Sequence, residues 1–348
     1  TGAIALNNSL TLGAGAATPI SLTTVTGPSS GTANLTFDTT GAITVSGAVG
    51  TNIGTITITN SGGTTFSSTV SAATVAITST TAGNAVTFAD NLTLTSGMTV
   101  GAGSAAYNVA INGTTNTIAG TTTFANTGTL ALGNGSDTIN FTGGVVATAP
   151  SAITVNGTVT AAGTGVITLG DSNTAVTIGG TSTIGGTSTG QITTGAIALN
   201  NSLTVGATAA TPITLTTVTG PSSGSANLTI NTAGVVAVGG AVGTNVGTLT
   251  ITNSGGTTFS GTVAATTVTL TNTTGSIIFN DALTATTLNT AAQGYNVELN
   301  GASGTITNAV TFSNTGALAL GASGGTLTFN GGLTATAPSA STLKGTIA

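Results

Sequence analysis

Cysteine, histidine and tryptophan are absent from this 348-residue chain, and only seven residues carry a formal charge. Without Cys or His the chain lacks the usual zinc ligands, and without Cys it has no disulfides, so packing and backbone hydrogen bonds must supply its stability. General acid–base catalysis uses side chains that are almost missing here. We therefore expect no enzyme activity, no catalytic or metal-ligating residues and no cofactor. The charged residues are Asp38, Asp90, Asp137, Asp171, Asp281, Glu298 and Lys344.

Two classes of partner are also excluded by what is scarce. A single Lys or Arg side chain cannot neutralise the phosphates of a nucleic acid. No apolar run reaches the ~18 residues that a membrane-spanning helix needs, so we expect no membrane span. Six Pro residues are too few for a collagen or polyproline structure.

The residues that are present favour a folded, all-β protein. Hydrophobic residues make up 39% of the chain and its mean hydropathy is +0.48, which distinguishes it from low-charge disordered segments, because those also lack hydrophobic residues. Val, Ile and Thr suit pleated strands. Gly and Asn suit the turns between strands.

A long internal repeat is the main feature of the sequence. Residues 1–81 and 194–274 are identical at 62 of 81 positions without a gap, and the match continues with small deletions to Ala348. We interpret residues 1–193 as one complete unit and residues 194–348 as a second, incomplete unit. Because residue 1 lies in mid-repeat, we expect the sequence to be part of a longer or processed chain.

Differences between the two copies separate packing from chemistry. Apolar residues are replaced by other apolar residues, which is the change that a protein core tolerates. Ionisable residues are not retained in this way: Asp38 becomes Asn231, and Asp90, which matches Asp281, is the one acidic residue kept in both copies. This pattern indicates that the architecture itself is the function.

Short runs of alternating apolar residues predict half-buried strands about every 8–12 residues. Examples are residues 55–59, 92–95 and 138–141, with turns at 60–63 and 133–136. Near-identical copies that tolerate small deletions favour a β-solenoid, of the right-handed parallel β-helix type, with rungs of ~20–30 residues. The alternative is a series of tandem immunoglobulin-like β-sandwiches of ~100 residues each.

A Gly-Gly-Thr-Ser-Thr doubling lies between the two copies, at residues 179–190. A segment so rich in Gly, Ser and Thr fits either of two roles. It is a flexible joint between the units or a further pair of thin rungs.

A family resemblance appears in the phrase ITNSGGTTFSSTVSAATV at residues 58–75. It resembles the β-strand repeats of very large bacterial surface proteins, including filamentous-haemagglutinin-like adhesins, autotransporter passengers and S-layer-associated repeat proteins. The resemblance covers nearly the whole chain as a style of Gly, Thr and Asn turns between Val, Ile and Phe strands. It implies secretion and a location at the cell surface or in an extracellular fibre, and it carries over no catalytic residue.

Three acidic positions deserve separate interpretation. Residues 133–139 match part of the Gly-rich calcium-binding nonapeptide of repeat toxins, but the single carboxylate of Asp137 supplies too few oxygen ligands for calcium, and we interpret the segment as a plain turn. The retained pair, Asp90 and Asp281, is expected to accept hydrogen bonds from backbone N–H groups of its own turn.

Polar surface patterns give the remaining candidates. Asn-x-Ser/Thr sequons begin at Asn34, Asn91, Asn112 and Asn227, which chance explains in so Thr-rich a chain. Thr-x-Thr arrays at residues 55–59 and 248–252 fit outward strand positions. They would also fit a carbohydrate-binding or an ice-binding surface.

The sequence thus predicts an extracellular or cell-surface structural protein whose repeats build or extend a homopolymeric fibre or surface layer. The predicted partner is the protein itself, and surface carbohydrate is a second one. The alternatives are the stalk of a surface adhesin and a carbohydrate- or ice-binding β-solenoid.

Overall fold

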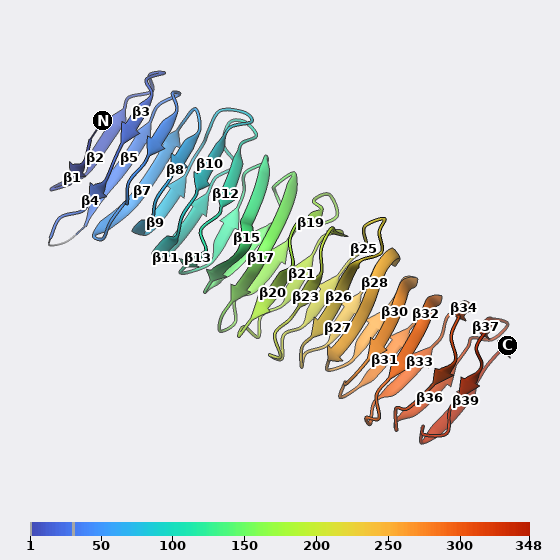
Figure 1. Ribbon diagram of the computed structural model, residues 1–348. Helices are drawn as coiled ribbons and strands as arrows, with labels where there is room; N and C mark the ends of the chain where they lie inside the picture. The colour runs from blue at the N-terminus through green and yellow to red at the C-terminus, as the bar shows by residue number, and fades with distance from the viewer. Residues whose placement is uncertain (1, 30–31) are drawn as a thin grey trace. The chain divides into compact units, whose positions relative to one another are not determined.

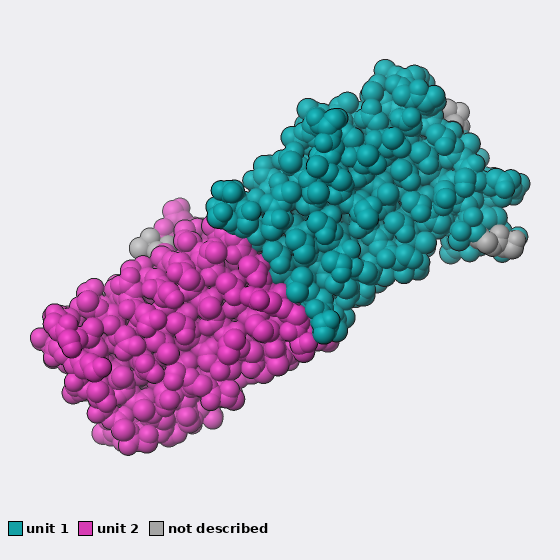
Figure 2. Space-filling view, turned by 180° about the vertical axis from the view of Figure 1, so that it is seen from behind, with its two compact units in different colours: residues 1–176 teal, residues 177–348 magenta. Residues whose placement is uncertain are grey.

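The computed structural model describes residues 2–29 and 32–348, and it divides into two compact units, Thr1–Val176 and Thr177–Ala348 (Figure 2). Among the described residues there is no helix, and the strands stack in parallel as a β-solenoid of about 16 turns. This confirms the predicted fold class. The sandwich alternative is wrong, because immunoglobulin-like sheets are antiparallel. The division into compact units differs from the sequence repeat, whose second copy begins inside unit 2, at Thr194.

Unit 1 contains strands β1 to β18 in chain order (Figure 1). Their bounds are β1 Ile4–Ala5, β2 Leu10–Gly13, β3 Ile20–Leu22, β4 Val25–Thr26, β5 Ala33–Asp38, β6 Ile43–Val45, β7 Ile53–Asn60, β8 Thr64–Phe66, β9 Val70–Ile77, β10 Ala85–Phe88, β11 Leu92–Val100, β12 Asn108–Ile111, β13 Thr115–Ile118, β14 Thr122–Phe124, β15 Thr129–Phe141, β16 Gly144–Ala147, β17 Ala152–Ala161 and β18 Val166–Leu169.

Strand β19, Val176–Ile178, includes the last residue of unit 1 and the first residues of unit 2. Unit 2 continues with β20 Ser182–Gly186, β21 Ile192–Thr194, β22 Ile197–Leu199, β23 Leu203–Val205, β24 Ile213–Leu215, β25 Val218–Thr219, β26 Ala226–Asn231, β27 Val236–Val238, β28 Val242–Asn253, β29 Thr257–Phe259, β30 Val263–Leu270, β31 Ser276–Phe279, β32 Leu283–Thr290, β33 Asn296–Leu299, β34 Ser303–Ile306, β35 Val310–Thr311, β36 Ala317–Leu320, β37 Thr326–Phe329, β38 Leu333–Thr334, β39 Ala340–Leu343 and β40 Thr346–Ile347.

Each turn of the chain adds a strand to three parallel ladders, so that strands one turn apart are hydrogen-bonded neighbours (Figure 1). In unit 1, ladder 1 begins with β1 and β4, ladder 2 with β2, β5 and β7, and ladder 3 with β3, β6 and β8. Long strands such as β11 bend at the corner between ladders 1 and 2 and contribute to both. The rung length matches the prediction of ~20–30 residues, since Ile43 pairs with Thr64 one turn later.

The core consists of the inward residues of these ladders, stacked turn upon turn. The alternation predicted for residues 55–59 is confirmed, because Ile56 and Ile58 are fully buried between outward Thr residues. Aromatic rings stack in the same way in both repeats. The ring centroids of Phe66 and Phe88 are 5.1 Å apart, those of Phe259 and Phe279 are 4.9 Å apart, and the two rings of each pair are nearly parallel. Such contacts add to the stabilisation from area burial alone.

Two sequence expectations are changed or decided by the ladders. The predicted turn at residues 133–136 does not end a strand. Strand β15 runs through it with a register shift between Leu132 and Asp137, because Gly133 takes a φ of 82° that lets the chain bend and resume pairing.

The doubling at 179–190 contains a true rung, since β20 pairs with β23 and Ile184 is buried against Val205. The thin-rung interpretation is therefore the correct one for this part of the segment.

Inward-facing hydroxyl groups satisfy backbone carbonyls at the corner between ladders 2 and 3. The Thr39 Oγ1 atom lies 2.5 Å from the carbonyl oxygen of Ala16 and 2.7 Å from that of Thr18, one turn earlier. Thr232, the counterpart of Thr39, makes the equivalent contacts at 2.8 and 2.6 Å. Since a buried carbonyl without a partner is costly, these Thr residues let the corner turn inside the core.

The part of the chain that the structure describes offers no helix of the length and apolarity needed to cross a membrane.

Removing one ring of a stacked pair tests this core. Phe279→Ala deletes the side chain that stacks on Phe259 and should lower the free energy of unfolding by about 3–5 kcal/mol, the cost of an aromatic truncation in a close-packed core. The measurement is urea unfolding followed by circular dichroism. The control is Val235→Ala, whose side chain is 64% exposed and should change stability by less than about 0.5 kcal/mol. Equal effects of the two variants would contradict the stacked core.

Candidate functional surfaces

The ionisable residues do not form a site. Among the described residues, no group of three or more acidic, His or Cys side chains is close enough to hold a metal ion. Asp90 accepts a hydrogen bond from the backbone N–H of Asn91 at 2.7 Å, and Asp281 accepts one from Ala282 at 2.7 Å. The hydrogen bonds expected for this pair are thereby confirmed, and they give the two carboxylates a local structural role.

Asp137 is held in the bend within β15. Its Oδ2 atom accepts a hydrogen bond from the backbone N–H of Asn134 at 2.7 Å, and the residue is only 5% exposed. Across the turn, the Asn156 amide donates to the carbonyl of Gly133 at 3.2 Å. These contacts fit the interpretation of residues 133–139 as a structural bend, because they use the carboxylate within the bend itself.

Asn side chains connect successive turns, a role that the sequence analysis missed. The Asn34 Oδ1 atom accepts a hydrogen bond from the backbone N–H of Thr55, and Asn227 accepts one from Thr248, both at 2.8 Å. Each bond lies beside a register shift that removes the regular ladder partner of the N–H group. Three of the sequon asparagines named above, Asn34, Asn91 and Asn227, have this role. The other such pairs are Asn91 with Thr115, Asn108 with Thr129, and Asn296 with Ala317.

Outward Thr residues form columns on the stacked strands. In unit 2 the column on β20, β23, β26, β28, β30 and β32 is uninterrupted over five turns and ends at an Asn: Thr183, Thr204, Thr229, Thr250, Thr269 and Asn289. In unit 1 the corresponding column is broken by Ala76 and Val146. The Thr-x-Thr arrays are therefore in register over part of the surface, and the ice-binding alternative stays a prediction.

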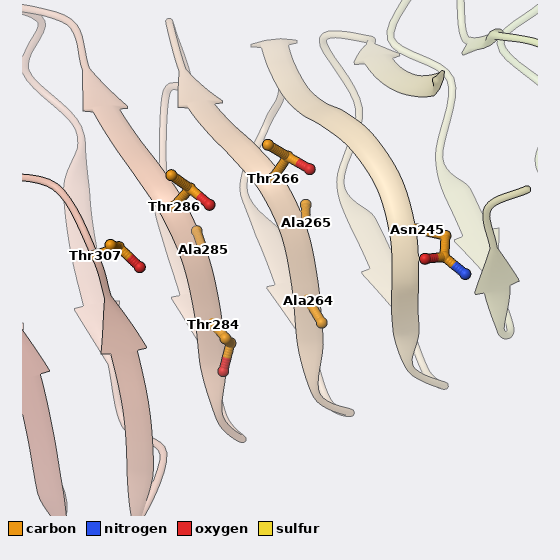
Figure 3. A pocket seen from close by; sticks show the side chains of 8 residues that line it. All are labelled: Asn245, Ala264, Ala265, Thr266, Thr284, Ala285, Thr286 and Thr307. Atoms are coloured by element: carbon orange, nitrogen blue, oxygen red, sulfur yellow. The ribbon is translucent and has the colours of Figure 1, made fainter. Parts of the chain in front are cut away.

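A groove lies over corresponding strand bends in the two repeats. The groove of unit 2 has a volume of about 240 Å³ and includes Asn245, Ala265, Thr266, Thr286 and Thr307 in its lining. Figure 3 shows Thr266 and Thr286 on the neighbouring strands β30 and β32, with Ala265 and Ala285 beside them. We call this the unit 2 corner groove.

The equivalent surface of unit 1 is also hollowed, with a volume of about 290 Å³. Its lining includes Asn52, Ser71, Ala72, Ala73 and Thr95. We call it the unit 1 corner groove. The repeat aligns the first four of these residues with Asn245, Ala264, Ala265 and Thr266 of unit 2.

The two Asn residues of the grooves adopt a conformation that shapes the corner. Asn52 has a φ of 64° and Asn245 a φ of 71°, in the left-handed region that Asn tolerates better than most residues. The backbone there passes so close to Gly27 and Gly220 that a side chain at either glycine would meet the carbonyl group of the Asn. The close approach fixes the end of each groove in the same way in both repeats.

Two buried tyrosines occupy corresponding positions in the two repeats. The Tyr107 hydroxyl donates to the carbonyl of Gly101 at 2.5 Å, and burial raises the pKa of Tyr107 to about 12. The Tyr295 hydroxyl donates to the carbonyl of Leu270 at 2.8 Å and accepts from the N–H of Ala291 at 2.9 Å. Burial raises the pKa of Tyr295, and the bond from Ala291 partly opposes that rise.

No protein-family model matches the chain, and no curated protein or solved structure matches it either. The resemblance to bacterial surface repeats therefore stays a prediction.

High pH should destabilise the fold through Tyr107. Its pKa is 10.0 in the unfolded chain and about 12 when folded, so the folded state holds the proton more tightly. The stabilisation is complete below about pH 10 and is lost as the pH rises through about 12. Urea midpoints measured over this range should fall with increasing pH, and less steeply in Tyr107→Phe. Equal slopes for the variant and the wild type would show that this phenol does not control the loss.

We expect Asp137 to stabilise the bend within β15 and not to bind calcium. Asp137→Ala removes the acceptor of the Asn134 N–H group and should cost about 1–2 kcal/mol of stability, measured by thermal unfolding. Added calcium or a chelator should leave the melting temperature of the wild type unchanged. A calcium-dependent rise that Asp137→Ala abolishes would instead support the nonapeptide site.

Proposed function

We propose that this chain is an extracellular structural protein whose tandem β-repeats build or extend a homopolymeric fibre or a cell-surface layer. The proposal rests on one observation: near-identical stretches of the two repeats form the same parallel rungs, and the strands of these rungs pair with the strands of neighbouring rungs. A rung that is built to be covered on both sides is a unit of an extended array.

The first described rung of repeat 1 shows which apolar residues a neighbouring rung would cover. Leu12 of β2 and Ile20 of β3 are partly exposed. Their counterparts in repeat 2, Val205 and Ile213, are buried, because β20 and β21 pair with the strands that carry them. Since most of the surrounding residues are identical in the two copies, this rung is suited to pair with another rung of the same kind.

The last described rung shows the same contrast. Leu343 of β39 is 61% exposed, whereas its counterpart in repeat 1, Val155, is fully buried. Leu333 is partly exposed, whereas its counterpart Val145 is buried in register with Ile167 of β18.

Unpaired strand edges favour association with further strands. A net charge of −5 on 348 residues opposes such association only weakly. The covering rung belongs either to another repeat of the same chain or to a second copy, and both arrangements extend the ladders into a longer structure.

Concentration-dependent assembly tests this function. The purified chain should form filaments in electron micrographs and sediment faster with increasing concentration. Leu343→Lys places a charge on the last described rung and should shorten or abolish the filaments. Val235→Lys is the matched control, since Val235 is equally exposed at 64% but lies in the middle of unit 2, and it should assemble normally.

The proposal is wrong if the wild type stays monomeric at every concentration, or if the two Lys variants impair assembly equally. Single, tapered particles would instead support the adhesin stalk. Antibody labelling of intact cells of the source organism checks the location, and labelling seen only after lysis would contradict a surface layer.

A further inference from the structure

The two corner grooves occupy equivalent places in the two repeats, although their sequences differ in part. Asn245 corresponds to Asn52 and Ala265 to Ala72, whereas Thr266 corresponds to Ala73. A depression that recurs at the same position of the repeat is a product of the repeat's architecture. The differences between the copies then provide an internal comparison of its chemistry.

Small side chains create the unit 2 corner groove. Ala265 and Ala285 are paired in register where β30 and β32 bend. Both are almost fully buried and leave the bend without bulk, and the half-exposed Ala264 contributes a methyl group to the surface of the groove. No larger side chain fills the bend, and the neighbouring Thr and Asn residues stand around it (Figure 3).

The hydroxyl groups around this bend are available for a ligand. Thr266, Thr286 and Thr307 are exposed, and within the described part of the chain their side chains make no hydrogen bond to protein. The next Thr along β32 differs, because Thr287 accepts a bond from the Asn308 amide at 3.0 Å. Each free hydroxyl offers one donor and two acceptor positions, and the Asn245 amide adds donors and an acceptor.

The lining excludes several ligand classes. None of the lining residues of either groove is charged or aromatic, so an ion would find no opposite charge and a flat ring no stacking partner. A peptide could not add as a strand, because β30 already pairs with β28 on one side and β32 on the other.

We propose that the unit 2 corner groove binds a neutral oligosaccharide. Sugar hydroxyls can both donate to and accept from Thr266, Thr286 and Thr307, while the C–H face of a sugar ring covers the half-exposed methyl group of Ala264. The unit 1 corner groove has Ala73 in place of Thr266, so it binds the same ligand more weakly. This site does not depend on the proposed assembly.

Nuclear magnetic resonance titration of the ¹⁵N-labelled chain tests the site. The probes are cellohexaose, chitohexaose and mannohexaose, with an oligogalacturonate as the anionic comparison. At least one neutral probe should shift the resonances of the unit 2 corner groove. The Thr266→Val and Thr286→Val double variant keeps the side-chain shape but removes two hydroxyls, and it should bind at least about fivefold more weakly.

The matched control is Thr229→Val with Thr250→Val. It removes two outward hydroxyls, on β26 and β28, that lie outside the groove, and it should leave the affinity unchanged. Ala73→Thr should strengthen binding in unit 1. Backbone spectra identify any variant that fails to fold. If the double Val variant fails, the single Val variants are compared with a double Ser variant, Thr266→Ser with Thr286→Ser, which keeps the hydroxyls and should keep binding. The site is refuted if no neutral probe binds, if the groove variant binds like the wild type, or if the anionic probe shifts the same resonances equally.

Discussion

The parallel hydrogen-bond ladder is the constraint on which the rest of this structure depends. Because each turn returns to a place directly beside the previous one, every inward position lies against the same position one turn away. Phe66 on Phe88 and Ile56 beside Val75 are consequences of that geometry. The core is therefore a set of columns, and it tolerates Ile, Val or Leu at a position more readily than a change from apolar to polar.

The corners need a second set of interactions, because the ladders cannot satisfy the backbone where the chain turns. Inward hydroxyls such as that of Thr39 contact carbonyl groups of the preceding turn, and Asn34 supplies an acceptor to the N–H of Thr55 where the register shifts. These short side chains hold the corner without adding bulk. Small side chains also leave the two grooves open, because the strand bends there contain Ala where a larger residue would fill the surface.

The repeated alternation of apolar residues predicted much of the fold, and its limits have physical causes. Ile56 and Ile58 are buried as the pattern indicates, because inside and outside alternate along a strand whatever lies next to it. The run through Gly133 was misread as the end of a strand, since a register shift depends on the neighbouring turn, here at Asp137 and Gly157. The grooves were not foreseen for the same reason. Which residues become neighbours, as Ala265 and Ala285 do, depends on the number of residues in each turn, and the strand pattern alone does not give that number.

Stacking also explains the near-absence of charge. An outward residue in a parallel ladder lies about 4.8 Å from its equivalents in the turns on either side, and two like charges at that distance repel by about 1–3.5 kcal/mol. A charged position copied from turn to turn would accumulate this penalty along the whole column. The few charges within strands avoid it: Asp38 lies between Gly13 and Asn60, and Glu298 between Ile278 and Ala319. Thr, Ser and Asn keep the surface polar without repulsion, so a ladder that is repeated many times favours an uncharged surface.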